Sequence, residues 1–279
     1  MTVRTLVASD LDQTLIYSRR SARLPEAELS DLTCVEIYDG APQSFMTPAA
    51  ARMLAALPGS ALFVPVTTRT VEQLRRVRLP RPGAAPHHAI AANGGVLLVD
   101  GVPDGQWSAQ VASALGASAP LDLVATHVEA VCRPDWARSV RRAGGLFCYA
   151  VIDRATLPDR FVDDESAWAD GHGWRVSLQG RKIYWVPRSL TKSAAVREVA
   201  RRTGARSVLA AGDSLLDLDL LECADLAIRP AHGELHDSGW SASHARCTER
   251  AGARAGEEIV RWFLETAAAT PTAGRRRSR

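Results

Sequence analysis

Four short apolar runs, each followed or preceded by a helical pattern, constrain the fold of this chain most strongly. The runs are "TLVAS", "ALFVPVTT", "SVLAAGD" and "DLAIRP", at residues 5–9, 61–68, 207–213 and 225–230. Strands that are apolar along most of their length are typical of a parallel sheet that is buried on both faces. The alternation of such strands with helices predicts an α/β protein with a three-layer, Rossmann-like core.

Helix-capping residues support the same alternation. Thr47 stands before a helical pattern that has Pro48 at its first position, and Pro is favoured there. Thr70 and Gln73 have the spacing of a capping box, in which each side chain bonds the other residue's backbone. Thr191 precedes the pattern "KSAAVREVARRT" and is a third expected N-cap.

The middle of the chain, roughly residues 97–188, follows a different pattern. "VLLVDGVPDGQW" predicts a hairpin that turns at Asp100-Gly101, and "WRVSLQGRKIYWV" predicts one that turns at Gln179-Gly180. Hairpins mixed with helical stretches indicate an antiparallel α+β insert. We therefore divide the chain into a core (1–96), an inserted cap (97–188), the rest of the core (189–270) and a disordered basic tail (271–279).

Composition and charge exclude several classes of function. The net charge of +3 is too small to predict nucleic-acid binding, and part of it lies in the terminal run "RRRSR". The five cysteines are an odd number without a CxxC pair, which indicates free thiols in a reducing compartment. The sequence has neither a signal-peptide pattern nor an apolar run of bilayer length. We expect a cytoplasmic protein without a nucleic-acid or membrane partner; the sequence leaves the oligomeric state open.

Polar residues gather where the expected strands end. In an open parallel sheet, ligands bind beyond the carboxyl ends of the strands. Asp213 and Asp217, four residues apart, are expected on one face of a helix. Carboxylates that converge repel each other unless a cation relieves them, and Mg²⁺ takes oxygen ligands together with a substrate phosphate. The candidate residues at these positions are Asp10, Asp12, Thr67, Thr68, Asn93, Lys192, Asp213 and Asp217.

Carboxylates, Mg²⁺ and a lysine around a phosphate describe phosphoryl transfer. An Asp nucleophile forms an aspartyl-phosphate intermediate, and the metal reduces the repulsion between the two anions. A lysine stabilises charge on the phosphoryl oxygens. A second carboxyl group two residues on protonates the leaving oxygen and then activates water.

Four motifs, in order along most of the chain, resemble those of one superfamily. "DLDQT" matches the DxDxT motif of the haloacid dehalogenase-like (HAD) phosphohydrolases, and "VPVTTR" is similar to their second motif. Lys192 in "SLTKSAAV" matches the third motif, and "GDSLLD" matches the acidic fourth, GDxxxD. "IAANGGVLLVDG" and "KIYWVPRSLTKSAAV" are similar to the entrance and exit of a C2-type cap. The chain thus resembles the type IIB branch, which is Cof-like or sucrose-phosphatase-like.

The resemblance implies a role for each matching residue. Asp10 is then the nucleophile, Asp12 the general acid/base, Thr67 a phosphate-binding group and Lys192 the residue that orders nucleophile and phosphate. It also implies Mg²⁺ as the cofactor. The implied metal ligands are Asp10, Asp12 through its carbonyl, Asp213, and Asp217 directly or through water.

Some positions depart from the branch or allow two interpretations. Gln13 and Leu216 replace residues that are often Gly and Asn, and the segment 17–46 is long enough to form an enlarged flap beside the site. Thr68 and Arg69 are candidate substrate-binding residues that also fit a structural or surface role. Asn93 is either a substrate contact or a left-handed turn residue before Gly94.

The expected function is hydrolysis of a small phosphomonoester, a sugar phosphate or a phosphorylated small acid, by a Mg²⁺-dependent phosphatase. A sugar phosphomutase and a catalytically quiet binding module are the alternatives. The cap determines the substrate, and its side chains, Lys182 among them, fit a substrate pocket and a plain hairpin core equally well.

Overall fold

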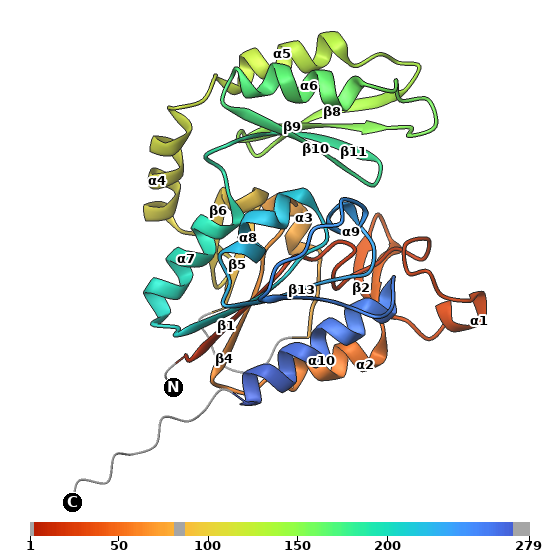
Figure 1. Cartoon of the computed structure of the whole chain (residues 1–279), viewed down its shortest axis with the longest axis vertical. Coiled ribbons are helices and arrows are strands. Elements are labelled where there is room, and N and C mark those ends of the chain that lie inside the picture. The colour runs from red at the N-terminus through yellow and green to blue at the C-terminus, as the bar shows by residue number, and fades with distance from the viewer. Residues whose placement is uncertain (1–2, 81–86, 270–279) are drawn as a thin grey trace, which may run out of the picture.

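Figure 1 shows the computed structural model, in which a larger part with a parallel sheet lies below a smaller part with an antiparallel sheet. The structure describes residues 3–80 and 87–269. The tail expected at 271–279 lies outside the described residues. No helix in the described ranges combines the length and the apolar character that crossing a bilayer requires.

The larger part is built on a five-stranded sheet in the order β14-β13-β12-β1-β4, and every pair is parallel. Strand β1 lies in the interior of the sheet, where Thr5 is level with Ser207 on one side and Ala61 on the other. All five residues of β1 are buried, as a strand covered on both faces requires. The strands are β1 (Thr5–Ser9), β4 (Ala61–Pro65), β12 (Ser207–Ala211), β13 (Leu226–Arg229) and β14 (Ala245–Cys247).

Helices cover both faces of this sheet. Helices α2 (Pro48–Ala55) and α10 (Ala253–Ala269) pack on one face, and α7 (Lys192–Thr203) and α8 (Leu218–Glu222) pack on the other (Figure 1). Successive side chains of a strand point to opposite faces. Leu6 accordingly joins the cluster that contains Val196 of α7, and Val7 joins the one that contains Leu54 and Phe263. The predicted three-layer α/β core is confirmed.

The predicted helix caps are present. The hydroxyl of Thr47 accepts a hydrogen bond from the backbone N–H of Ala50, and Thr70 with Gln73 forms the complete capping box of α3 (Val71–Arg75). Thr191 caps α7 in the same way. These short-range signals fix where three helices begin, because each cap satisfies backbone N–H groups that have no partner within the helix.

The smaller part is a four-stranded antiparallel sheet in the order β10-β11-β9-β8, with helices α5 (Leu121–Val131) and α6 (Phe161–Asp170) on its outer face (Figure 1). This confirms the predicted α+β insert, and the hairpin expected at Gln179-Gly180 is β10 with β11. The exact boundaries 97–188 stay a prediction. The strands are β8 (Ala137–Ala143), β9 (Phe147–Ile152), β10 (Trp174–Gln179) and β11 (Lys182–Pro187).

A small three-stranded antiparallel sheet lies between the two parts. Strand β5 (His88–Ala91) pairs with β6 (Val96–Val99), which pairs with β7 (Val102–Pro103) to form the hairpin expected at Asp100-Gly101. A parallel bridge from Val66 to Ile90 joins this sheet to the end of β4. The 3-10 turn η1 (Ala92–Gly94) follows β5, and α4 (Gly105–Leu115) then leads toward the cap.

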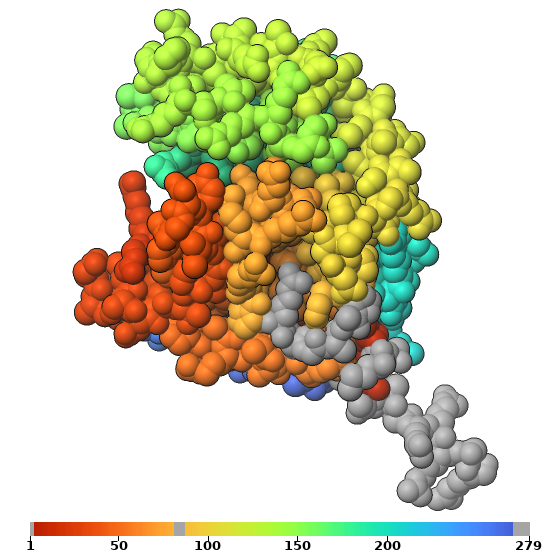
Figure 2. Space-filling view, turned by 180° about the vertical axis from the view of Figure 1, so that it is seen from behind, coloured from red at the N-terminus to blue at the C-terminus, as the bar shows by residue number. Residues whose placement is uncertain are grey.

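The long segment 17–46 forms the helix α1 (Glu26–Leu29) and a hairpin of β2 (Thr33–Tyr38) and β3 (Ala41–Met46), which we call the flap. A backbone hydrogen bond of 2.6 Å from Arg78 N to Val35 O fastens the flap to the chain beyond α3. Figure 2 shows the red to orange surface of this segment directly below the cap. The flap therefore stands at the side of the core, at the level where core and cap meet.

Candidate active site

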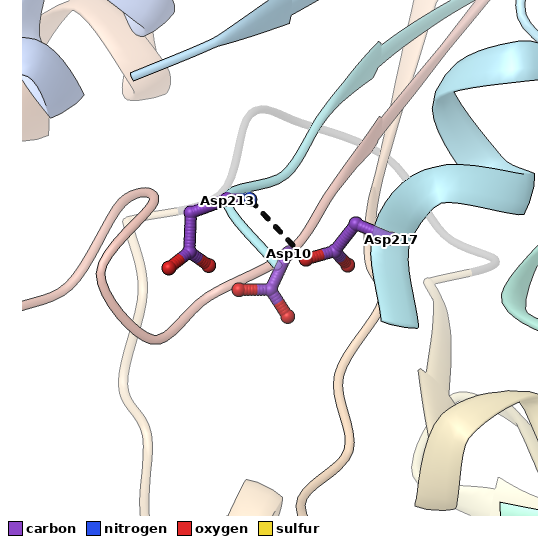
Figure 3. A group of neighbouring side chains, drawn as sticks. All are labelled: Asp10, Asp213 and Asp217. Carbon is purple, nitrogen blue, oxygen red and sulfur yellow. Dashed lines mark hydrogen bonds between the residues drawn. The ribbon is translucent and has the colours of Figure 1, made fainter. Parts of the chain in front are cut away.

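Three carboxylates from two segments of the chain converge at the carboxyl end of the parallel sheet (Figure 3). Asp10 follows β1, Asp213 follows β12, and Asp217 ends the 3-10 turn η2 (Leu215–Asp217). One oxygen from each of the three lies within 4.8 Å of the others, and all three residues are buried. Because β1 and β12 are neighbours in the sheet, the first two carboxylates are side by side.

Lys192, the first residue of α7, is the cation of this group and is fully buried. Its Nζ lies 2.6 Å from Asp10 Oδ1 and 2.5 Å from Asp217 Oδ1. Burial alone would lower the pKa of Lys192, but the two carboxylates outweigh it and raise that pKa. The ammonium therefore stays charged, and one positive charge faces three carboxylates.

Burial and the surplus of negative charge raise the pKa of two of the acids. Burial, together with the neighbouring Asp217, raises the pKa of Asp10 to about 7 in spite of the opposing effect of Lys192. Burial and Asp10 also raise the pKa of Asp213 well above its usual value. A divalent cation would remove this cost, and the donors present are carboxylate oxygens, which suit Mg²⁺. The residues therefore fit the metal that the sequence predicts.

Asp217 also stabilises the loop that carries Asp213. Its Oδ2 accepts hydrogen bonds from the backbone N–H groups of Asp213 (3.2 Å) and Ser214 (3.0 Å) and from the Ser214 hydroxyl (2.6 Å). A Cβ on Gly212 would lie 2.4 Å from the Cβ of Asp217, so this close approach requires glycine. Asp213 and Asp217 do not share a helical face as expected, because Asp213 lies in the loop and Asp217 folds back to bond it.

Thr67 and Asn93 lie at the same edge of the sheet and are both fully buried. The hydroxyl of Thr67 accepts a hydrogen bond from the backbone N–H of Arg69 (3.1 Å), so it shapes the loop after β4. Asn93 has a left-handed backbone (φ 55°), and its Nδ2 donates to the carbonyl of Leu190 (3.0 Å), just before Lys192. Within the described residues its Oδ1 has no hydrogen-bond partner. Asn93 thus has the turn geometry, and its role in substrate binding stays a prediction.

Asp12 differs from Asp10 in both exposure and partner. Its side chain is 51% exposed, and Arg69 binds it with two parallel contacts of 2.7 Å, Nε to Oδ2 and Nη2 to Oδ1. Burial would raise the pKa of Asp12, but the charge and hydrogen bonds of Arg69 bring it below its usual value. On its other side, Arg69 Nη1 lies 2.9 Å from Glu36 Oε2 of the flap. The sequence did not reveal Glu36 as part of this site.

The β10–β11 hairpin of the cap reaches the loop that carries the acids. Gln179 Nε2 donates to the Ser214 hydroxyl (3.0 Å), and the Ser177 hydroxyl donates to Glu234 Oε2 (3.1 Å) in α9 (Glu234–Asp237). Burial raises the pKa of Tyr184, and the nearby Lys182 and Thr68 oppose this rise. The cap hairpin is thus in direct contact with the core at this edge, and Thr68 belongs to that contact.

Lys182 is a cation that the cap places near the site. Its ammonium lies 5.2 Å from the ring centre of Tyr149 and 5.9 Å from that of Tyr184. Burial lowers the pKa of Lys182, but Tyr184, Asp12 and Tyr149 together raise it above its usual value. Lys182 therefore carries a positive charge close to Asp12.

Solved structures resemble this one over almost their whole length. The sucrose-phosphatase of Synechocystis sp., solved in complex with sucrose and phosphate, aligns with a TM-score of 0.65 at 15% identity over 94% of this chain and 98% of that one. A structure described as a HAD subclass IIB sugar phosphatase aligns with a TM-score of 0.53 at 10% identity over 94% and 99%. The chain shares the fold of these structures, a Rossmann-like core with an inserted cap. The predicted fold class, a Rossmann-like parallel-sheet core with an inserted α+β cap, is therefore confirmed.

A third similar structure is the C-terminal domain of the trehalose-6-phosphate phosphatase of C. albicans, with a TM-score of 0.54 at 13% identity over 94% of this chain and 93% of that one. No protein-family model and no curated protein sequence matches the chain. At such low identities the likeness establishes the fold, and the activity of this chain is argued from its own residues.

Proposed function

We propose that this chain is a Mg²⁺-dependent phosphatase that hydrolyses a small phosphomonoester through an aspartyl-phosphate intermediate. The observation that carries the proposal is the buried convergence of Asp10, Asp213 and Asp217 on Lys192 at the carboxyl edge of the sheet, next to the cap hairpin. The HAD subclass IIB fold supports it, since the solved neighbours include a sucrose-phosphatase and a sugar phosphatase.

The metal ligands we propose are Asp10, the carbonyl of Asp12 and Asp213, with Asp217 directly or through water. Asp213 suits direct binding best, because within the described residues its carboxylate accepts only a long hydrogen bond, from the Thr14 hydroxyl at 3.4 Å. Both oxygens of Asp217 already accept hydrogen bonds, which favours contact through water. When bound, Mg²⁺ supplies positive charge between the nucleophile and the phosphate.

The chain's own residues then divide the reaction between them. A carboxylate oxygen of Asp10 attacks phosphorus, and the bond from phosphorus to the leaving oxygen breaks while Asp12 gives that oxygen a proton. Asp12 next takes a proton from the water that attacks the aspartyl phosphate, so inorganic phosphate leaves and Asp10 is restored. Lys192 holds Asp10 in place and stabilises charge on the phosphoryl oxygens.

We further propose that Thr67 binds the phosphate, with Thr68, Arg69 and Asn93 as the predicted substrate-binding residues. Arg69 is held by Asp12 and Glu36, which favours an indirect role. A sugar phosphate or a phosphorylated small acid suits the cap, because Lys182 adds a cation and Tyr149 and Tyr184 add aromatic faces near Asp12. The cytoplasmic location stays a prediction.

Hydrolysis of p-nitrophenyl phosphate tests the function. We expect turnover with Mg²⁺, none after chelation, and a loss of ~10³-fold or more in Asp10→Asn, because the nucleophile is gone. Asp225→Asn, an exposed acid that bonds Val208 N near the opposite end of the sheet, is the matched control. Full turnover by Asp10→Asn would contradict the mechanism. Measuring phosphate against isomer formation from hexose phosphates separates a phosphatase from a mutase.

A further inference from the structure

The flap buries a charged side chain that the mechanism above does not use. Glu36 of β2 is 1% exposed, although its neighbours Ile37 and Tyr38 are both more than half exposed. The register between β2 and β3 shifts on either side of Glu36, which marks a β-bulge. A bulge changes the direction of a side chain relative to its strand, so the backbone itself turns this carboxylate inward.

Both oxygens of the Glu36 carboxylate have donors, which come from three segments. Ser44 of β3 donates through its hydroxyl to Oε2 (2.5 Å), Arg76 after α3 contacts Oε1 through Nε (3.2 Å), and Arg69 contacts Oε2 through Nη1 (2.9 Å). A buried carboxylate is tolerated only with such partners. Glu36 therefore fixes the flap to the loop after β4 and fixes that loop in return.

Arg69 transmits this constraint to Asp12. The guanidinium is planar, and its Nε and Nη2 bind the two oxygens of Asp12 while Nη1 binds Glu36. Because all three nitrogens belong to one rigid plane, a carboxylate that holds Nη1 also sets the direction of the edge that holds Asp12. The side chains of Arg69 and Glu36 are only 12% and 1% exposed, so water competes little for the contact between them.

We propose that Glu36 of the flap is a positioning residue for proton transfer by Asp12 and acts through Arg69. This inference rests on the proposed phosphatase function and assigns a role to the enlarged flap. Each carboxylate oxygen of Asp12 has two lone pairs, and Arg69 occupies one lone pair on each oxygen. The remaining edge is left to carry the proton for the leaving oxygen, in the direction that Glu36 and Arg69 determine.

The flap is rigid enough for this role. Besides the hydrogen bond from Arg78 to Val35, an antiparallel bridge joins Glu36 to Val77, and the guanidinium of Arg76 lies 4.4 Å from the ring centre of Tyr38. These contacts secure the strand on both sides of the bulge. Misplacement of a reacting group by about 1 Å can cost ~10²-fold in rate. A firmly held Glu36 therefore matters for catalysis, because it keeps Arg69 and, through it, Asp12 in place.

The test is the dependence of kcat/KM on the leaving group, measured with Mg²⁺ over a series from p-nitrophenyl to phenyl phosphate. Protonation by Asp12 matters most for the more basic leaving groups. Asp12→Asn should therefore steepen the plot of log kcat/KM against leaving-group pKa. We expect Glu36→Gln to steepen it in the same direction, with a loss of ~10-fold for phenyl phosphate and less than ~3-fold for p-nitrophenyl phosphate.

Two further variants separate positioning from folding. Ser44→Ala removes one donor to Glu36 and a long contact from Arg69 Nη2 (3.4 Å), and it should steepen the plot in the same direction by a smaller amount. Glu28→Gln is the matched control. Glu28 lies in the same segment 17–46, its carboxylate is 2.6 Å from Arg254 of α10, and its change should leave the slope unchanged. Thermal unfolding of each variant establishes that it is folded.

The outcomes are distinct. Equal losses across the whole series in Glu36→Gln and Ser44→Ala, or no loss in either, would overturn the positioning role while leaving the phosphatase function intact. A wild-type chain that hydrolyses none of the esters would instead overturn the function, and the inference with it. Steeper slopes in Glu36→Gln and Ser44→Ala beside an unchanged Glu28→Gln would support the inference.

Discussion

Two groups of charged side chains lie at the same edge of the sheet and differ in how far their charges are balanced. The first group, which we call the acidic centre, has Asp10, Asp213 and Asp217 around the single cation Lys192. The second, the flap network, pairs Asp12 and Glu36 with Arg69 and Arg76. The acidic centre carries surplus negative charge, whereas the flap network is balanced within the protein.

The difference indicates which group needs an external cation. In the acidic centre, burial and like charges raise the pKa of Asp10 and Asp213, which is the mark of carboxylates that lack enough positive charge. In the flap network, Arg69 brings the pKa of Asp12 below its usual value. A negatively charged phosphate ester arriving beside Asp12 raises that pKa again, which favours the protonated form that a general acid needs.

The largest expected effect comes from removing the cation of the acidic centre. Lys192→Met leaves Asp10 and Asp217 buried without their shared partner, so we expect a loss of ~10²–10³-fold in kcat and about 3–5 kcal/mol in the free energy of unfolding near pH 8. Arg201→Met, on the exposed side of the same helix, is the control and should change neither. Urea unfolding and p-nitrophenyl phosphate kinetics measure both quantities. Retained activity in Lys192→Met would contradict the role of the acidic centre.

Removal of the metal should make the free energy of unfolding depend on pH through the acidic centre. The folded-state pKa of Asp10 is about 7, above the value of 3.8 for a free carboxyl, so the folded chain holds more protons than the unfolded chain between these values. Without Mg²⁺, stability should therefore fall as the pH rises from about 4 to about 7, by up to about 4 kcal/mol.

Mg²⁺ favours the ionised carboxylates and should reduce this fall. Urea unfolding at several pH values, with Mg²⁺ and with a chelator, measures the difference. In Asp10→Asn the chelated protein should lose less stability over the same range. A metal-free wild type whose stability rises through this range would show that the acidic centre does not carry surplus negative charge.

The smallest expected effect compares two serines with matched roles. Ser214 donates to Asp217 at 2.6 Å in the acidic centre, and Ser44 donates to Glu36 at 2.5 Å in the flap network. Each change to Ala should cost about 1–3 kcal/mol, since a hydrogen bond to a charged acceptor is lost. Only Ser214→Ala should also weaken Mg²⁺ binding, as measured by calorimetry. Equal weakening in both variants would remove the distinction between the two groups.

The sequence alone predicted that Asp10, Asp213 and Asp217 converge, for a reason that lies in sheet geometry. Adjacent parallel strands end at one edge, so residues directly after β1 and β12 must meet, and Lys192 begins the helix beside them. The helix caps at Thr47, Thr70 and Thr191 depend on neighbours within three residues, which the sequence also contains. The hairpin in the cap followed from its turn residues in the same way.

The tertiary structure alone decided the flap network and the finer contacts of the acidic centre. Glu36 lies in a strand whose pattern does not mark it, and its burial depends on a bulge and on Arg69 and Arg76 far along the chain. Asp217 folds back onto Asp213, because its carboxylate accepts from the backbone N–H groups of Asp213 and Ser214, which have no partner within the helical turn that follows. Helix caps and strand ends can be predicted from nearby residues. Contacts between distant segments, such as Glu36 with Arg69 and Arg76, depend on how those segments pack, which the residues of one segment do not determine.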